Sequence, residues 1–215
     1  MLGQHVNQWD LEDLVCKFLF YQANPGETVL SLIPSIHWLT TSVSHLLVFH
    51  SADAIFHAPN NLSGTSSMYH ETICSTPQWK SGGTIGPHCD CVFLDNGSDK
   101  LGARSVDVAR VHLFFSFELE KQVYPCALVQ DFHMTFTEPD PDNGMRVVKP
   151  TFNTNGSRSM SIVHVDLIVR TTHLLPIFQA SSTLPPQLTF CQTLDSFRAF
   201  YINKYINYYV FKTVF

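Results

Sequence analysis

The stretch VARVHLFFSFE, residues 108–118, decides the fold of this chain. Strict apolar–polar alternation is typical of a half-buried β-strand. It predicts one face made of Ala109, Val111, Leu113, Phe115 and Phe117, and an opposite face made of Arg110, His112, Ser116 and Glu118. A second apolar run, residues 123–132, follows after a short polar spacer and predicts the antiparallel partner of a β-hairpin. Pro125 inside this run predicts an edge position or a bulge, because proline cannot donate to a central ladder.

Shorter runs outside the hairpin predict further strands at residues 46–57, 91–95, 145–148 and 160–169. Residues 60–90 are rich in Gly, Ser, Thr and Pro, which predicts a long surface segment. Several short strands with turn-rich spacers favour a small antiparallel barrel or sandwich.

Two segments carry helical periodicity. Residues 9–22 place apolar side chains three or four apart, at Leu11, Leu14, Val15, Phe18 and Leu19. Residues 193–209 do the same with Leu194, Phe197, Tyr201, Tyr205 and Tyr208. Such spacing is typical of an amphipathic helix. We therefore expect an α+β, mostly β fold with an N-terminal and a C-terminal helix.

The expected elements divide the chain into four parts. Residues 1–57 hold the N-terminal helix and a linking strand, and residues 58–100 form a loop-rich segment with a short strand. Residues 101–180 form a small β domain, and residues 181–215 form the C-terminal helix and tail.

The composition narrows the class of protein. The chain has 215 residues, of which 45% are hydrophobic and 14% charged, so it carries enough apolar surface for a folded core. No stretch reaches the roughly 18 apolar residues of a membrane span, and no signal peptide is evident. We therefore expect an intracellular protein whose six cysteines are reduced. The net charge of −5 argues against a stand-alone nucleic-acid binder.

A series of sequence words resembles the C-terminal region of transposases of the Plavaka group of fungal DNA transposons. In chain order they are APNNLSG (58–64), TPQWKSGG (76–83), CDCVFLDN (89–96), DVARVHLFFSFELEKQVYPCALV (107–129), DNGMRVVKP (142–150), HVDLIVRTTHLLPIF (164–178) and LDSFRAFYINKY (194–205). Together they cover roughly residues 46–209.

The chain departs from the family pattern at several places. The family's Ala-Leu-Val-x-Trp-Phe lacks its tryptophan here, where residues 127–132 read ALVQDF. The family's closing His-His-x-His-Glu is replaced by YYVFK at residues 208–212. The resemblance also implies that the family's metal-dependent catalytic core, a carboxylate triad on an RNase H-like fold, lies upstream of the matched words. We therefore expect a non-catalytic remnant of a transposase, without activity of its own, or alternatively a domesticated protein- or DNA-binding module.

The sequence gives only weak evidence for catalytic groups. Asp53, Asp107 and Asp166 lie in apolar strands, but isolated acids favour a structural role over Mg²⁺ binding. A zinc site from His88, Cys89 and Cys91 with Cys74 upstream is an alternative, although zinc ligands usually follow a Cys-x₂₋₄-Cys spacing. We expect no catalytic residue, no metal, no cofactor and no small-molecule ligand.

The densest polar cluster within an apolar strand is His164, Asp166, Arg170 and His173. If that strand continues, His164 and Asp166 share one face. The four residues are the candidate binding residues, for DNA or for other transposase domains in the parent protein, with a structural role as the alternative. A nuclear location follows from the resemblance, and no membrane partner is expected.

Overall fold

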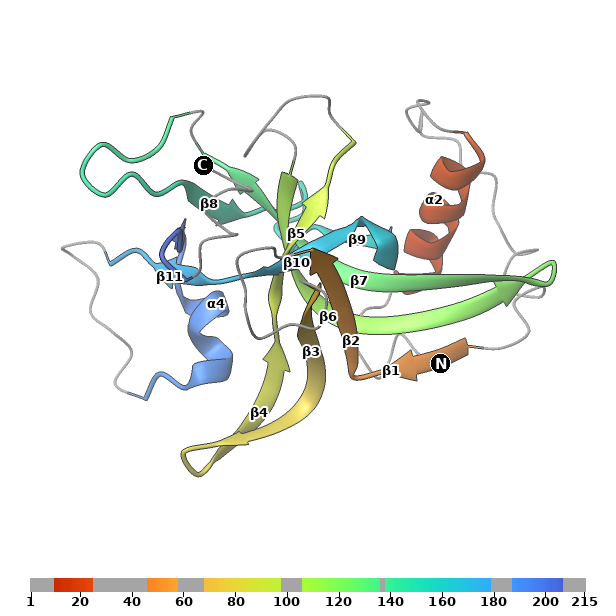
Figure 1. The fold of residues 1–215 in the computed structure, drawn as a ribbon, viewed down its shortest axis with the longest axis horizontal. Helices are drawn as coiled ribbons and strands as arrows, with labels where there is room; N and C mark the ends of the chain where they lie inside the picture. The colour runs from red at the N-terminus through yellow and green to blue at the C-terminus, as the bar shows by residue number, and fades with distance from the viewer. Residues whose placement is uncertain are drawn as a thin grey trace.

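A computed structural model of the chain describes residues 10–24, 46–57, 68–97, 106–135, 138–178 and 187–206. The fold is mostly β, with a nearly closed antiparallel barrel, an N-terminal helix and a short C-terminal helix (Figure 1). The predicted fold class is therefore confirmed. The word APNNLSG, residues 58–64, lies outside the described residues.

The hairpin predicted from residues 108–132 is the centre of the barrel. Strands β6 (Val106–Leu119) and β7 (Gln122–Met134) pair along almost their whole length. Glu120 and Lys121 form the turn with φ of 52° and 67°, the left-handed conformation that a tight two-residue hairpin turn requires. Pro125 directly precedes Cys126, the first residue of β7 that pairs with the neighbouring strand β9, which fits the predicted edge position.

The face assignment predicted for β6 is wrong because the strand contains a β-bulge. Pairing with β7 shifts by one residue between Val111 and Leu113, so His112 is the extra residue. A bulge reverses the alternation beyond it. Accordingly, Ala109 and Val111 pack in one cluster together with Phe114, whereas Leu113, Phe115 and Phe117 pack in another.

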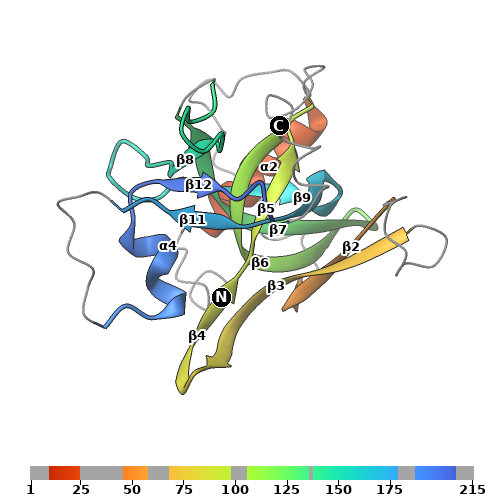
Figure 2. The ribbon, with the colours of Figure 1, turned by 60° about the vertical axis from the view of Figure 1, so that its left-hand side comes forward.

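The remaining strands extend the sheet on both sides of the hairpin. On one side, β5 (Cys91–Asp95) pairs with β6 and with β10 (Ile168–Thr172), while β1 (Leu46–Phe49) pairs with the far end of β6. On the other side, β9 (Met160–His164) and β8 (Val147–Pro150) pair with β7. Beyond β8 lie β12 (Phe200–Ile202) and β11 (Leu174–Pro176), as Figure 2 shows.

A second, three-stranded sheet replaces much of the predicted surface segment. Strand β2 (Ser51–His57) pairs with β3 (Met68–Ser81), which pairs with β4 (Thr84–Cys89) across the Gly82–Gly83 turn. The prediction of one strand over residues 46–57 is wrong, since the chain leaves the barrel at His50 and enters this sheet. Composition misled the prediction for residues 68–90, where both prolines, Pro77 and Pro87, lie within strands.

Two other predicted elements end earlier than expected. The strand over residues 160–169 is interrupted by the 3₁₀ turn η3 (Val165–Leu167). The helix predicted for residues 193–209 is wrong beyond its first turn. Helix α4 (Thr193–Ser196) follows the 3₁₀ turn η4 (Phe190–Gln192) and is itself followed by β12, and residues 207–209 lie outside the described part.

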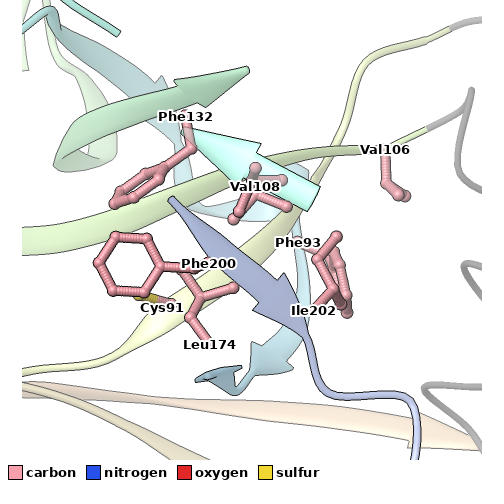
Figure 3. Packing of buried hydrophobic residues seen from close by; sticks show 9 residues of the cluster. Cys91, Phe93, Val106, Val108, Phe132, Leu174, Phe200 and Ile202 are labelled. Carbon is pink, nitrogen blue, oxygen red and sulfur yellow. The ribbon is translucent and has the colours of Figure 1, made fainter. Parts of the chain in front are cut away.

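Three hydrophobic clusters fill the described part of the molecule. The barrel cluster, shown in Figure 3, joins β5, β6 and β7 to the C-terminal strands; its members are Cys91, Phe93, Val106, Val108, Phe132, Val148, Leu174, Phe200 and Ile202. The helix cluster packs α2 (Leu11–Ala23) against Leu113, Phe115 and Phe117, which confirms the predicted N-terminal helix. The third cluster packs the other face of β5, β6 and β7 against Ile73 of the small sheet.

All six cysteines are free thiols, as expected for reduced residues. Among the described residues, no helix has both the length and the apolar character needed to cross a bilayer.

Candidate functional site

The four candidate binding residues lie in three different environments. His164 ends β9 and Asp166 lies in η3, where the Asp166 N–H donates to His164 Nδ1 over 3.3 Å. An Asp166 carboxylate oxygen also lies 3.3 Å from that nitrogen, but the Asp166 side chain is 87% exposed, so this second contact contributes little to stability. These two residues form a local cap.

Arg170 is turned away from that cap and toward the small sheet. Its side chain is buried, lies 3.6 Å from the Glu71 carboxylate and places its guanidinium 4.6 Å from the centre of the Phe56 ring. Glu71 also accepts hydrogen bonds from the backbone N–H and the hydroxyl of Thr171, at 3.0 and 2.6 Å. Arg170 and Glu71 therefore join strand β10 of the barrel to strand β3.

His173 contacts the C-terminal strand segment. Its Nδ1 lies 3.2 Å from Asn203 Nδ2, and its carbonyl accepts from the Asn203 N–H over 2.9 Å. The structure thus brings together only His164 and Asp166 among the four candidates. Each of the four makes a contact within the fold, and their binding role stays a prediction.

A polar layer between the barrel and helix clusters, buried at Arg110 and Gln130 and half exposed at Asp195, is a site that sequence reasoning missed. Arg110 on β6 and Arg158 both contact Asp195 of α4, with N–O distances of 3.2 and 3.0 Å. His112 Nε2 lies 3.4 Å from the side-chain oxygen of Gln130, which is fully buried. The alternation of β6 assigned Arg110 and His112 to a polar face, but the bulge was not visible in the sequence.

The layer carries net positive charge and unused hydrogen-bond donors. With His112 neutral, two guanidinium groups face one carboxylate. Within the described part of the chain, Arg110 Nε, Gln130 Nε2 and Arg158 Nη1 are buried and have no hydrogen-bond partner. Buried donors of this kind are commonly satisfied by ordered water or by a bound acceptor. The layer could therefore hold water or a small anion.

Acid destabilisation is expected from His112. Burial lowers its pKa to about 4, and the Arg110 guanidinium adds to this effect. The unfolded chain, with an ordinary pKa of 6.5, takes up a proton that the folded chain does not. Stability contributed by the neutral imidazole is therefore complete above about pH 6.5 and is lost as the pH falls toward 4, by about 2–3 kcal/mol at pH 4.5.

Urea unfolding at pH 7 and pH 4.5 measures this effect. Wild type is expected to lose about 2–3 kcal/mol more than His112→Gln between the two pH values. His133→Gln is the matched control, since His133 is exposed. Equal losses in wild type and His112→Gln would contradict the prediction.

A third group lies on the outer face of the small sheet. Cys74 on β3, His88 on β4 and Asp90, just after β4, place one Sγ, one imidazole nitrogen and one carboxylate oxygen within 4.8 Å of one another. His88 Nε2 and Asp90 Oδ1 are 3.0 Å apart. Burial raises the pKa of the Cys74 thiol, and Asp90 and Asp53 raise it further, so Cys74 is no activated nucleophile.

Of the zinc ligands considered from the sequence, the structure brings together Cys74 and His88 but not Cys89 or Cys91. Cys91 is buried in the barrel cluster, and burial raises its pKa to about 12. Cys89 lies beside Arg110 and Ser75 rather than beside His88. Asp90 takes their place next to Cys74 and His88.

Comparison with family models, curated proteins and solved structures gives no match for this chain.

Proposed function

We propose that this chain is a non-catalytic part of a Plavaka-type transposase, a remnant without catalytic activity of its own. The observation that carries the proposal is the set of sequence words in family order. Five of the seven words coincide with elements of the large sheet or with turns next to them: β5, the β6–β7 hairpin, β8, the segment from η3 to β11, and α4 with β12. The word TPQWKSGG lies in the β3–β4 hairpin of the small sheet, and APNNLSG lies outside the described residues. A shared sheet explains why those five words occur together, because each strand needs its neighbours.

The placement of the acidic residues supports a non-catalytic part. Two-metal strand transfer needs carboxylates that converge on neighbouring Mg²⁺ ions. Asp53 lies on β2 and accepts from the Thr72 hydroxyl over 2.7 Å. Asp107 lies on β6, and Asp166 lies in η3 with an exposed side chain. Among the described residues, these three acids belong to different elements and form no common cluster.

DNA cleavage by the purified chain tests this proposal. We expect no cleavage of supercoiled plasmid or of oligonucleotide duplexes with Mg²⁺ or Mn²⁺. Cleavage that is lost in Asp107→Asn but retained in the matched control Asp142→Asn would overturn it. A mobility-shift assay at increasing salt is run in parallel, and a strongly salt-dependent shift would favour the DNA-binding alternative.

A second candidate function is a domesticated protein-contact module, which one observation favours. Strand β1 reads LLVF, and Leu46, Leu47, Val48 and Phe49 are all exposed. Among the described strands, β1 pairs only with β6, so its other edge offers backbone hydrogen bonds to an added strand. An apolar edge on a chain of net charge −5 suits another protein domain better than DNA. In the parent protein this partner would be another transposase domain in the nucleus.

A further inference from the structure

We propose that Cys74, His88 and Asp90 form a binding site for a divalent transition metal, with zinc as the fitting ion. This site is separate from the proposed transposase ancestry and needs no catalytic core. It differs from the zinc set suggested by Cys-x-Cys spacing, because a carboxylate takes the place of the two neighbouring thiols.

The strand pairing places all three side chains on one face. Ile73 and Ser75 are buried on the inner face of β3, so alternation puts Cys74 on the outer face. Thr76 pairs with His88, which puts His88 on that same outer face. Asp90 lies opposite Cys74 and returns to this face two residues after His88.

Backbone contacts hold Asp90 and Cys74 in place before any ion binds. The Asp90 N–H donates to the Cys74 carbonyl over 3.0 Å, and the Cys74 N–H donates to Asp90 Oδ2 over 2.7 Å. The Asp90 carbonyl is used elsewhere, since it accepts from Val111 of the barrel over 2.9 Å. The Asp90 carboxylate therefore takes the place of the Asp90 carbonyl as acceptor of the Cys74 N–H. This hydrogen bond fixes the direction of the carboxylate and leaves its Oδ1 toward His88. Ligands fixed in this way lose little conformational freedom on binding.

The third donor is oriented by a neighbouring ring. Trp79 lies beside His88, with ring centres 5.2 Å apart and an interplanar angle of 38°. The His88 and Asp90 side chains are 36% and 26% exposed, so an ion can reach them from solvent. Figure 1 shows that the β3–β4 hairpin projects from the barrel.

The donor set selects the class of ion. One thiolate sulfur, one imidazole nitrogen and one carboxylate oxygen suit Zn²⁺ and similar ions, whereas Mg²⁺ and Ca²⁺ prefer oxygen alone. Zinc ligands about 2.0–2.3 Å from the ion lie roughly 3.3–3.7 Å from one another. The observed spread of up to 4.8 Å needs only a small inward movement of the side chains. Three protein ligands leave a fourth position for water or an incoming group.

Cobalt substitution measures the site directly. The purified, reduced chain is titrated with Co²⁺ and followed by visible absorption, then back-titrated with Zn²⁺. We expect one equivalent of Co²⁺, a sulfur-to-cobalt charge-transfer band and full displacement by Zn²⁺. Cys74→Ser is expected to remove the charge-transfer band, and His88→Gln to weaken Zn²⁺ binding at least tenfold.

Two matched variants serve as controls. Cys191→Ser and His133→Gln change a cysteine and a histidine outside the group and are expected to bind like wild type. If Cys74→Ser and His88→Gln also bind like wild type, or if wild type binds no Co²⁺, the proposal is overturned and the group is an ordinary His88–Asp90 ion pair beside a thiol.

Wild type alone supplies a second readout in case a variant does not fold. Zn²⁺ is expected to slow alkylation of Cys74 by iodoacetamide at least fivefold, as followed by peptide mass spectrometry, while alkylation of Cys191 is unchanged. Equal rates for Cys74 with and without Zn²⁺ would contradict the site.

Discussion

Phe200→Ala is expected to lower the free energy of unfolding by about 3–5 kcal/mol. Phe200 is fully buried in the barrel cluster, where its ring packs edge-on against Phe132 (Figure 3). Its ring also packs edge-on against Phe197. Truncation removes this buried area and leaves a cavity, and strands on both sides of β12 limit how far the core can collapse into it.

Urea unfolding followed by far-UV circular dichroism measures the loss. Tyr205→Ala is the matched control, because Tyr205 is an aromatic residue of the same segment and is 72% exposed. It is expected to change stability by less than about 1 kcal/mol. A similarly small loss in Phe200→Ala would mean that β12 does not complete the barrel.

Glu71→Ala is expected to cost a comparable 3–5 kcal/mol, roughly the loss seen when one member of a buried ion pair is removed. The Glu71 side chain is 17% exposed and that of Arg170 is 3% exposed. The substitution deprives Arg170 of its carboxylate and removes the acceptor of the Thr171 N–H and hydroxyl. Because these contacts join the two sheets, their loss should also loosen the small sheet from the barrel.

Glu71→Gln separates the charge from the hydrogen bonds. It keeps one acceptor oxygen for Thr171 and is expected to lose clearly less stability than Glu71→Ala in the same urea assay. Glu138→Ala changes an exposed glutamate and should stay within about 0.5 kcal/mol of wild type. Equal stability of Glu71→Ala and wild type would show that the two sheets are not joined through this residue.

The elements that could be predicted from the sequence are those with a long and consistent pattern. The β6–β7 hairpin combines two apolar runs with a short polar turn, and helix α2 buries the same stripe that its spacing predicts. In both cases the local pattern and the tertiary packing agree, so the sequence alone is sufficient.

The C-terminal segment was mispredicted because its apolar residues satisfy two periods. Leu194, Phe197 and Tyr201 follow helical spacing, whereas Phe200 and Ile202 alternate as in a strand. Pairing of Phe200 with Val148 and of Ile202 with Leu174 decides the conformation. That choice depends on strands more than twenty residues away, which a local pattern does not contain.

The bulge at His112 was not predicted for a similar reason. Both faces of β6 are buried, so Ala109, Val111, Leu113 and Phe115 read as one continuous apolar face. Only the register against β7 reveals the extra residue. The contacts of the polar layer around Arg110 therefore could not be predicted. The one signal for them in the sequence is a charged residue within an otherwise apolar strand.

The group of Cys74, His88 and Asp90 could be predicted from the sequence only in part. His88 and Asp90 are two residues apart, which predicts a shared face if the segment is extended. Cys74 joins them only through the β3–β4 hairpin, and the composition of residues 68–90 concealed that hairpin. Ile73 and Ser75, which alternate on the buried face of β3, are the sequence signal for that strand.

Sequencing the genomic locus and transcript that encode this chain tests the central claim, descent from a Plavaka-type transposase, most directly. We expect coding sequence for an RNase H-like core with an acidic triad upstream in the same orientation, within the same mobile element. A locus with no transposase-like coding sequence and no element ends around the gene would contradict it.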